Sequence, residues 1–113
     1  MSRQASGLKA WAIQRVTAIY IGLFALYLLL AMMFAMPESY AAWKDWFSGA
    51  GMSTFTMLFV LSVLMHAWIG VRDVLIDYLH NIAIRTTALS VVAFVLIASG
   101  VLAAQALVLS RIV

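Results

Sequence analysis

The sequence predicts an all-α membrane protein with three transmembrane helices, and three observations lead to this fold class. Hydrophobic residues make up 66% of the chain and charged residues 10%, against roughly 45–50% and about 25% in ordinary globular proteins. Three stretches of at least 20 residues carry no charged side chain, and they cover residues 16–36, 52–71 and 86–110. A chain of 113 residues cannot bury so much apolar surface in a core of its own, so lipid is its expected solvent.

Each uncharged stretch is long enough to cross a membrane as a helix. About 20 residues, rising about 1.5 Å each, span a hydrocarbon core of roughly 30 Å, whereas barrel strands alternate in polarity and are much shorter. The first stretch exceeds the apolar region of a cleaved signal peptide, and no A-x-A site follows it, so we expect it to be retained. We expect a single membrane-anchor domain over residues 1–113, with the second helix continuing to about residue 79.

The segments outside the spans predict how the chain sits in the membrane. The connection 37–51 begins with the only proline and ends in a glycine-rich turn. Its Tyr40, Trp43 and Trp46 predict an aromatic belt at one membrane face, and Trp11 does so at the other.

Basic residues predict the orientation of the three spans. The side of the N-terminus carries five of them and the other side two, namely Arg3, Lys9, Arg15, Arg72 and Arg85 against Lys44 and Arg111. Lysine and arginine concentrate in cytoplasmic loops. We therefore expect the N-terminus in the cytoplasm and the C-terminus outside it.

The composition also excludes several classes of function. The chain has no cysteine, which rules out disulfides, cysteine-ligated zinc and iron–sulfur ligation by this chain. Its basic residues are scattered over chain ends and loops, so we do not expect nucleic-acid binding.

His66 lies inside the second apolar stretch. It follows the midpoint, near Leu61, by about five residues, so it lies roughly 7 Å toward the predicted cytoplasmic side. An imidazole there loses its water and needs a partner. Ionisable residues inside a membrane typically mark functional sites. The alternative is a hydrogen bond to a neighbouring helix and nothing more, and this residue alone leaves both open.

Polar and small residues continue along the helix face of His66. At about 100° per residue, the polar and small residues within about 40° of His66 include Ser62, Gly70, Asp73, Asp77 and His80. Gly70 lies one turn away and would leave room for a flat group held by the imidazole, such as the edge of a haem. It would equally suit a close contact between two membrane helices.

The two histidines cannot share one metal ion. His66 and His80 are about 21 Å apart along a helix, whereas metal–imidazole bonds are about 2 Å long. A zinc site needs about four ligands, while haem iron accepts a single histidine from one chain. If His66 ligates haem, a second axial ligand must come from another chain or the iron stays five-coordinate.

Two residues near the predicted cytoplasmic face have two interpretations each. Arg15 could neutralise a haem propionate, or it could be an ordinary anchor at the end of a span. Tyr78 points about 120° away from His66. Tyrosine is common at the membrane–water interface, and its phenol can also donate a hydrogen bond to a quinone carbonyl.

The run H-A-W-I-G-x-x-x-V-L-x-D-Y, from His66 to Tyr78, resembles the small cytochrome b membrane-anchor subunits of succinate dehydrogenase, respiratory complex II. The run R-V-T-A-I-Y, from Arg15, resembles the start of the first helix in that family. Three spans in a chain of this length fit the same family.

The resemblance implies that the three helices form half of a heterodimeric haem-binding helix bundle, completed by a larger cytochrome b subunit. His66 would be an axial ligand of the iron of haem b, with Gly70 packed beside the haem and Arg15 near its propionates. Tyr78 would hydrogen-bond ubiquinone, and Asp77 would support that contact or deliver protons.

The resemblance also implies an assembly. An iron–sulfur subunit and a flavoprotein subunit would carry the iron–sulfur clusters and the FAD, so this chain would be non-catalytic alone and part of a succinate:ubiquinone oxidoreductase. It would lie among the lipids of a bacterial inner membrane. Fumarate reductase anchors share the architecture, but those without haem lack the histidine, so His66 favours succinate dehydrogenase.

One alternative function belongs to a different class, a small homo-oligomeric transporter or channel. Such proteins usually place an acidic residue inside a span, and the three uncharged stretches contain none. A homodimer in which two copies of His66 share one haem is a further alternative.

Overall fold

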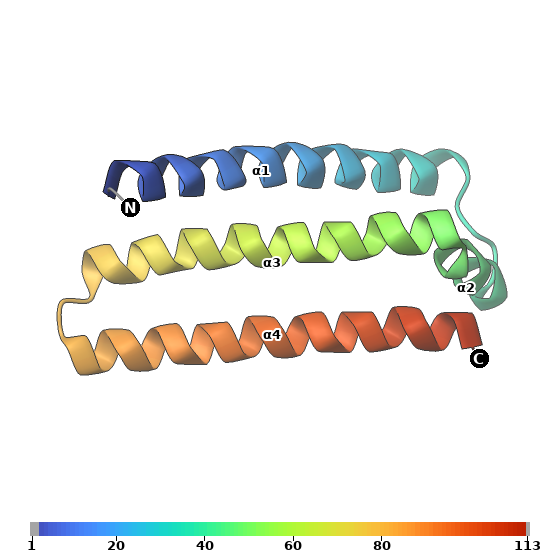
Figure 1. Cartoon of the computed structure of the whole chain (residues 1–113). Coiled ribbons are helices and arrows are strands. Elements are labelled where there is room, and N and C mark those ends of the chain that lie inside the picture. Colours follow the sequence, from blue (N-terminus) through green and yellow to red (C-terminus); the bar gives the residue numbers. More distant parts are fainter. Residues whose placement is uncertain (1–2, 113) are drawn as a thin grey trace.

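The protein is a layer of antiparallel helices. The structure, a computed structural model, describes the backbone of residues 3–112 and the side chains of residues 7–112. Within that range it contains helices and no strand, which confirms the all-helical prediction. The helices are α1 (Arg3–Phe34), α2 (Tyr40–Ser48), α3 (Ala50–Tyr78) and α4 (Ile82–Ile112). The long helices lie side by side with α3 in the middle, and α2 lies at the end where α1 passes to α3 (Figure 1).

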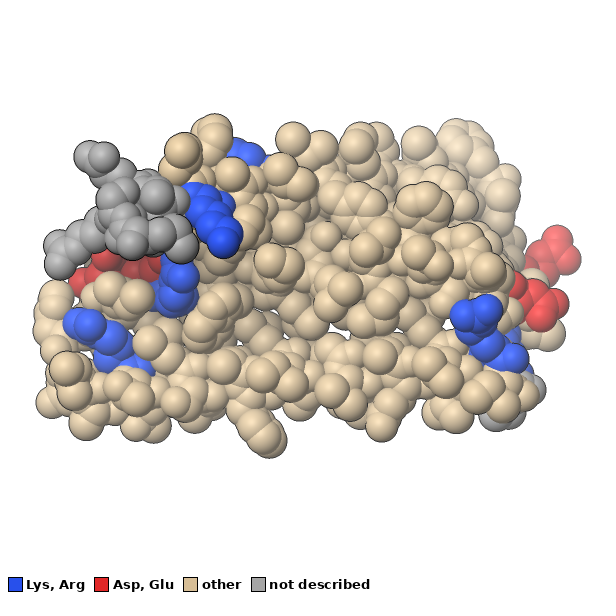
Figure 2. Space-filling view, in the orientation of Figure 1, with Lys and Arg blue, Asp and Glu red and all other residues tan. Residues whose placement is uncertain are grey.

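Three of the helices are long and apolar enough to cross a membrane, as the sequence predicted. They cover Gly7–Phe34, Ala50–Tyr78 and Ile82–Ile112. Figure 2 shows lysine and arginine near the two ends of the molecule and an uncharged region between them. The first helix ends at Phe34, because Pro37 lacks an N–H and disfavours helical backbone in the residue before it.

The layer has almost no enclosed core. Helix α3 packs against both α1 and α4, and α1 does not pack against α4. Of the described side chains only four are buried, namely Thr17, Phe24, Ser53 and Ile69. Most apolar side chains therefore face outward, where lipid or another chain must cover them.

Helix α2 was not expected from the sequence. Ser39 caps its first turn, because the Ser39 Oγ accepts a hydrogen bond from the Ala42 N–H at 3.1 Å. The ring of Trp46 lies 6.4 Å from that of Tyr27 and 5.8 Å from that of Trp43, centroid to centroid. The aromatic residues of the connecting segment are thus carried on a short helix that packs against the bundle rather than on an irregular loop.

The turn between α3 and α4 is held by hydrogen bonds at both helix ends. The Asn81 Oδ1 accepts from the N–H groups of Ala83 and Ile84 at 2.9 and 3.2 Å, which caps α4. The Arg85 Nε donates to the carbonyl oxygen of Leu79 at 2.9 Å. These contacts fix the end of α3, where Tyr78 is the last helical residue.

Helix α4 lies close to α3 at Gly100. A Cβ atom at this position would lie 2.7 Å from the Leu64 Cδ1. A real carbon–carbon contact is about 3.5–4.0 Å, so a side chain here must displace Leu64 or push the helices apart.

We expect Gly100→Leu to destabilise the bundle by about 1–3 kcal/mol, because it overpacks the contact between α3 and α4. Gly100→Ala should cost less, since the Leu64 methyl is the end of a flexible side chain. The control is Ala98→Leu, which adds the same side chain at an exposed position of α4. Unfolding in detergent would measure the difference, and equal stability of Gly100→Leu and Ala98→Leu would contradict it.

Candidate functional site

The site is built around a hydrogen bond between the first and third helices. The Thr17 Oγ1 in α1 lies 3.1 Å from the His66 Nδ1 in α3. Thr17 is buried, with 7% of its surface exposed, and His66 is half-buried. The imidazole therefore has the polar partner that its depth in the apolar span requires.

The neighbours of Thr17 indicate which group donates in this bond. The Thr17 Oγ1 lies 2.7 Å from the carbonyl oxygen of Ile13 and 3.2 Å from that of Gln14. A carbonyl oxygen only accepts and a hydroxyl has one hydrogen, so the hydroxyl hydrogen goes back to α1. The Thr17 oxygen then accepts from the Nδ1–H of His66, and in this tautomer the lone pair of the imidazole is on Nε2.

A groove adjoins His66 on the outside of the α1–α3 contact. Its volume is about 440 Å³, and it is lined by Gln14, His66, Ala67, Gly70, Val71 and Val74. Its walls are small or apolar apart from Gln14 and His66. The Gln14 Oε1 is buried without a hydrogen-bond partner among the described residues, and such atoms are uncommon in native structures.

Gly70 has room around it within this chain. A Cβ atom there would meet nothing closer than the Gln14 Nε2, at 3.7 Å, which is an ordinary van der Waals distance. Packing between α1 and α3 therefore does not require a glycine at this position. A glycine that does allow a close contact between two helices is Gly100, where a Cβ atom would lie 2.7 Å from the Leu64 Cδ1.

The donor set decides which metal the site suits. Among the described residues no three histidine, cysteine, aspartate or glutamate side chains gather to hold a metal ion. A zinc site needs about four such ligands, whereas haem iron takes one imidazole nitrogen from a chain. His66 offers one such nitrogen, Nε2, and lines a groove bordered by Ala67 and Gly70, which fits the haem requirement.

Arg15 does not lie beside His66. It is about 160° around α1 from Thr17, its side chain is exposed, and its guanidinium carbon lies 5.7 Å from the centroid of the Trp11 ring. That geometry is a cation–π contact and suits a residue at the end of a span.

Asp77 and Tyr78 are the last two residues of α3. Both are exposed, Tyr78 to 77%. Tyr78 lies about 18 Å beyond His66 along the helix axis. One turn before Asp77, Arg72 and Asp73 form an ion pair at 3.1 Å. The phenol and carboxylate are thus free to meet a group outside this chain, but they form no common cluster with His66.

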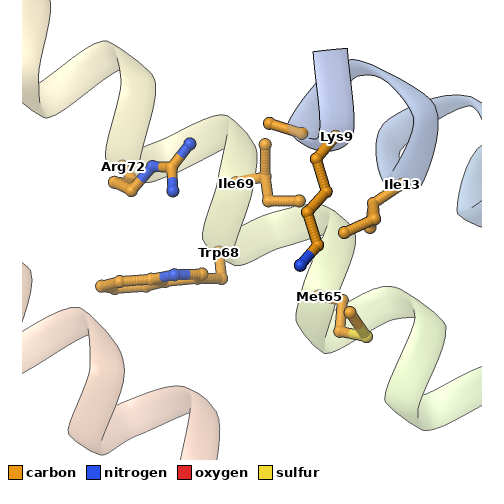
Figure 3. A pocket seen from close by; sticks show the side chains of 7 residues that line it. Lys9, Ile13, Met65, Trp68, Ile69 and Arg72 are labelled. Carbon is orange, nitrogen blue, oxygen red and sulfur yellow. The ribbon is translucent and has the colours of Figure 1, made fainter. Parts of the chain in front are cut away.

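A second groove lies on another face of α3. Its volume is about 370 Å³, and Figure 3 shows Lys9 from α1 and Arg72 from α3 among the apolar side chains that line it. The apolar lining comprises Ala10, Ile13, Met65, Trp68 and Ile69. It contains none of the residues that the sequence suggested for haem or quinone binding, and long basic side chains at the end of a span usually anchor it at the interface.

Thr17 and Gln14 are the residues that sequence reasoning missed. Gln14 directly precedes the R-V-T-A-I-Y run, and Thr17 is the third residue of that run. Thr17 is also a hydroxyl residue inside an apolar span. A hydroxyl in a span is a weak signal for a bond between helices. Its partner lies 49 residues away, and only the register of α1 against α3 identifies that partner.

Comparison with known proteins identifies the family of this chain. Residues 1–102 match the family described as "Succinate dehydrogenase/Fumarate reductase transmembrane subunit". The chain belongs to this family. It is 33% identical over 105 residues to the "Succinate dehydrogenase hydrophobic membrane anchor subunit" of Coxiella burnetii (strain RSA 493 / Nine Mile phase I), which covers 93% of this chain and 91% of the relative. With three apolar helices, this member of the family is a multi-pass membrane protein.

We expect Gly70→Ala to leave the stability of the bundle unchanged or raise it by up to about 1 kcal/mol, because alanine is the better helix former and its Cβ atom has space. Unfolding of the variant in detergent would measure this. A clear loss of stability would mean that α1 approaches Gly70 more closely than the 3.7 Å contact allows.

Proposed function

We propose that this chain is the membrane-anchor subunit of a succinate:ubiquinone oxidoreductase that binds haem b jointly with a second membrane subunit and contributes to the site of ubiquinone reduction. One observation carries the proposal. Thr17 occupies the Nδ1 of His66 at 3.1 Å, so Nε2 is the nitrogen left for iron. Family membership and the name of the Coxiella relative support the same complex.

His66 would hold the haem, with Gly70 packed beside it. When bound, the haem would supply a one-electron redox centre whose potential depends on its axial ligands and surroundings. Arg15 would reach a propionate by leaving Trp11, which its exposed and flexible side chain permits. An arginine–carboxylate contact of this kind is a strong charge-assisted hydrogen bond.

The partner subunits would complete what this chain lacks. The larger cytochrome b subunit would also help to hold the haem, and its helices would cover part of the exposed apolar surface. The iron–sulfur and flavoprotein subunits would carry the iron–sulfur clusters and the FAD. The chain alone would then be non-catalytic, and succinate would be oxidised elsewhere in the complex.

Tyr78 and Asp77 would form this chain's part of the quinone site. The Tyr78 phenol would donate a hydrogen bond to a quinone carbonyl and stabilise the negative charge that develops there on reduction. The Asp77 carboxylate, one residue earlier at the same helix end, would pass protons toward the reduced quinone. Their exposure supports this role, because the substrate must reach them.

The charges support one orientation in the membrane. The N-terminus of α1 and the turn after α3 lie at the same end of the molecule (Figure 1). The described basic side chains number four at that end and two at the other, namely Lys9, Arg15, Arg72 and Arg85 against Lys44 and Arg111. We place the first end in the cytoplasm of a bacterium, the chain in its inner membrane, and the quinone residues on the cytoplasmic side.

We expect His66→Leu to abolish or strongly perturb the low-spin haem b bands in the reduced-minus-oxidised spectrum of the purified complex, because it removes the ligating nitrogen. His80→Leu is the matched control, since His80 is exposed and lies beyond the end of α3. An unchanged spectrum in His66→Leu would remove this residue from the ligand role and sink the proposal of haem binding.

We expect Tyr78→Phe to lower the rate of quinone reduction about tenfold or more, because a hydrogen bond to a developing charge is lost. Succinate oxidation with an artificial acceptor should hardly change. Tyr40→Phe removes a phenol at the other end of the molecule, 82% exposed, and serves as the control. Equal losses in both assays would indicate a defect of assembly rather than of the quinone site.

A further inference from the structure

We infer that Thr17 is a positioning residue for His66: its hydroxyl oxygen accepts the Nδ1–H, holds Nε2 toward the groove beside Gly70, and increases the electron donation of that nitrogen to a bound iron. This inference rests on the proposed function, in which His66 ligates haem. Its test is therefore designed to separate the two.

The geometry fixes the direction of the hydrogen bond. The Thr17 hydroxyl has one hydrogen and three neighbours, the carbonyl oxygens of Ile13 and Gln14 and the Nδ1 of His66. The contact with Ile13 is the shortest, at 2.7 Å, and this carbonyl has only lone pairs to offer. The Nδ1 contact, at 3.1 Å, is then satisfied only when the imidazole donates.

The surroundings make this bond hard to replace. Thr17 is 7% exposed, so water does not readily take its place at Nδ1. Among the residues that line the groove, only Gln14 and His66 have polar side chains. Without the Thr17 oxygen, an imidazole holding Nδ1–H would bury an unpaired donor, which is unfavourable.

The bond would also tune the ligand. A hydrogen bond from the far nitrogen of a metal-bound imidazole fixes its tautomer and orientation and raises its basicity. A more basic ligand stabilises the ferric state relative to the ferrous state, which lowers the midpoint potential of the haem. Deleting the acceptor should therefore raise that potential.

Thr17 also joins α1 to α3, so a test must separate tuning from packing. Thr17→Val keeps the branched shape and deletes the acceptor, whereas Thr17→Ser keeps the hydroxyl and deletes the methyl group. The matched control is Thr54→Val, because the Thr54 hydroxyl also bonds back within its own helix, to the Ala50 carbonyl at 2.7 Å, but at an exposed position.

The measurements are a redox titration of the haem bands in the purified complex and the rate of haem loss to an excess of a haem-binding protein. We expect Thr17→Val to raise the midpoint potential and to lose haem about 10–100-fold faster, the usual effect of removing such a partner. Thr17→Ser and Thr54→Val should resemble the unaltered complex in both measurements.

Three results would overturn the inference. The first is a Thr17→Val complex with unaltered potential and haem loss, and the second is an equal shift in Thr17→Ser. If Thr17→Val does not assemble, Thr17→Ala takes its place, and failure of both beside an assembled Thr17→Ser would assign the hydroxyl to assembly instead. Retention of the haem bands in His66→Leu is a separate result that would remove the proposed haem ligation itself.

Discussion

A single hydrogen bond within an apolar layer, from the imidazole of His66 to the hydroxyl of Thr17, is the constraint on which the organisation of this protein depends. Inside a span, an imidazole without a partner is costly, and the surrounding lipid offers none. Two side-chain hydrogen bonds among the described residues join α1 to α3: this one, and that from the Tyr20 hydroxyl to the Phe55 carbonyl at 2.6 Å. Together they set the register of the two helices, and the first also decides which nitrogen of His66 is available.

The chain leaves much apolar surface exposed, and in the proposed function a second membrane subunit covers part of it. Three long helices in one layer leave most apolar side chains on the outside, and within residues 7–112 the only buried apolar side chains are those of Phe24 and Ile69. Lipid alone could cover such faces. In the proposed function, His66 and His80 cannot both ligate the haem iron, because they lie too far apart along the helix direction. The second membrane subunit of the proposed function therefore rests on the need for another iron ligand more than on exposed area.

Much of the fold could be predicted because lipid imposes a strong rule. Uncharged stretches of about 20 residues have few alternatives to a transmembrane helix, and these stretches lie within α1, α3 and α4 apart from the last two residues before Pro37. Helix α2 was missed because its residues carry no such signal, and its start depends on the local cap by Ser39. His66 could be singled out because an ionisable group in a span is costly. Thr17 and the close contact of Gly100 with Leu64 could not, because both depend on the register of helices that are far apart in the sequence.

The most direct test of this account is an experimental structure of the purified complex, at a resolution that places side chains and cofactors. The account predicts that the His66 Nε2 is bonded to the iron of a haem b, that the Thr17 hydroxyl remains within hydrogen-bond distance of Nδ1, and that the sixth ligand comes from another chain. A haem held entirely by other subunits, with the His66 ring packed only against side chains, would contradict it.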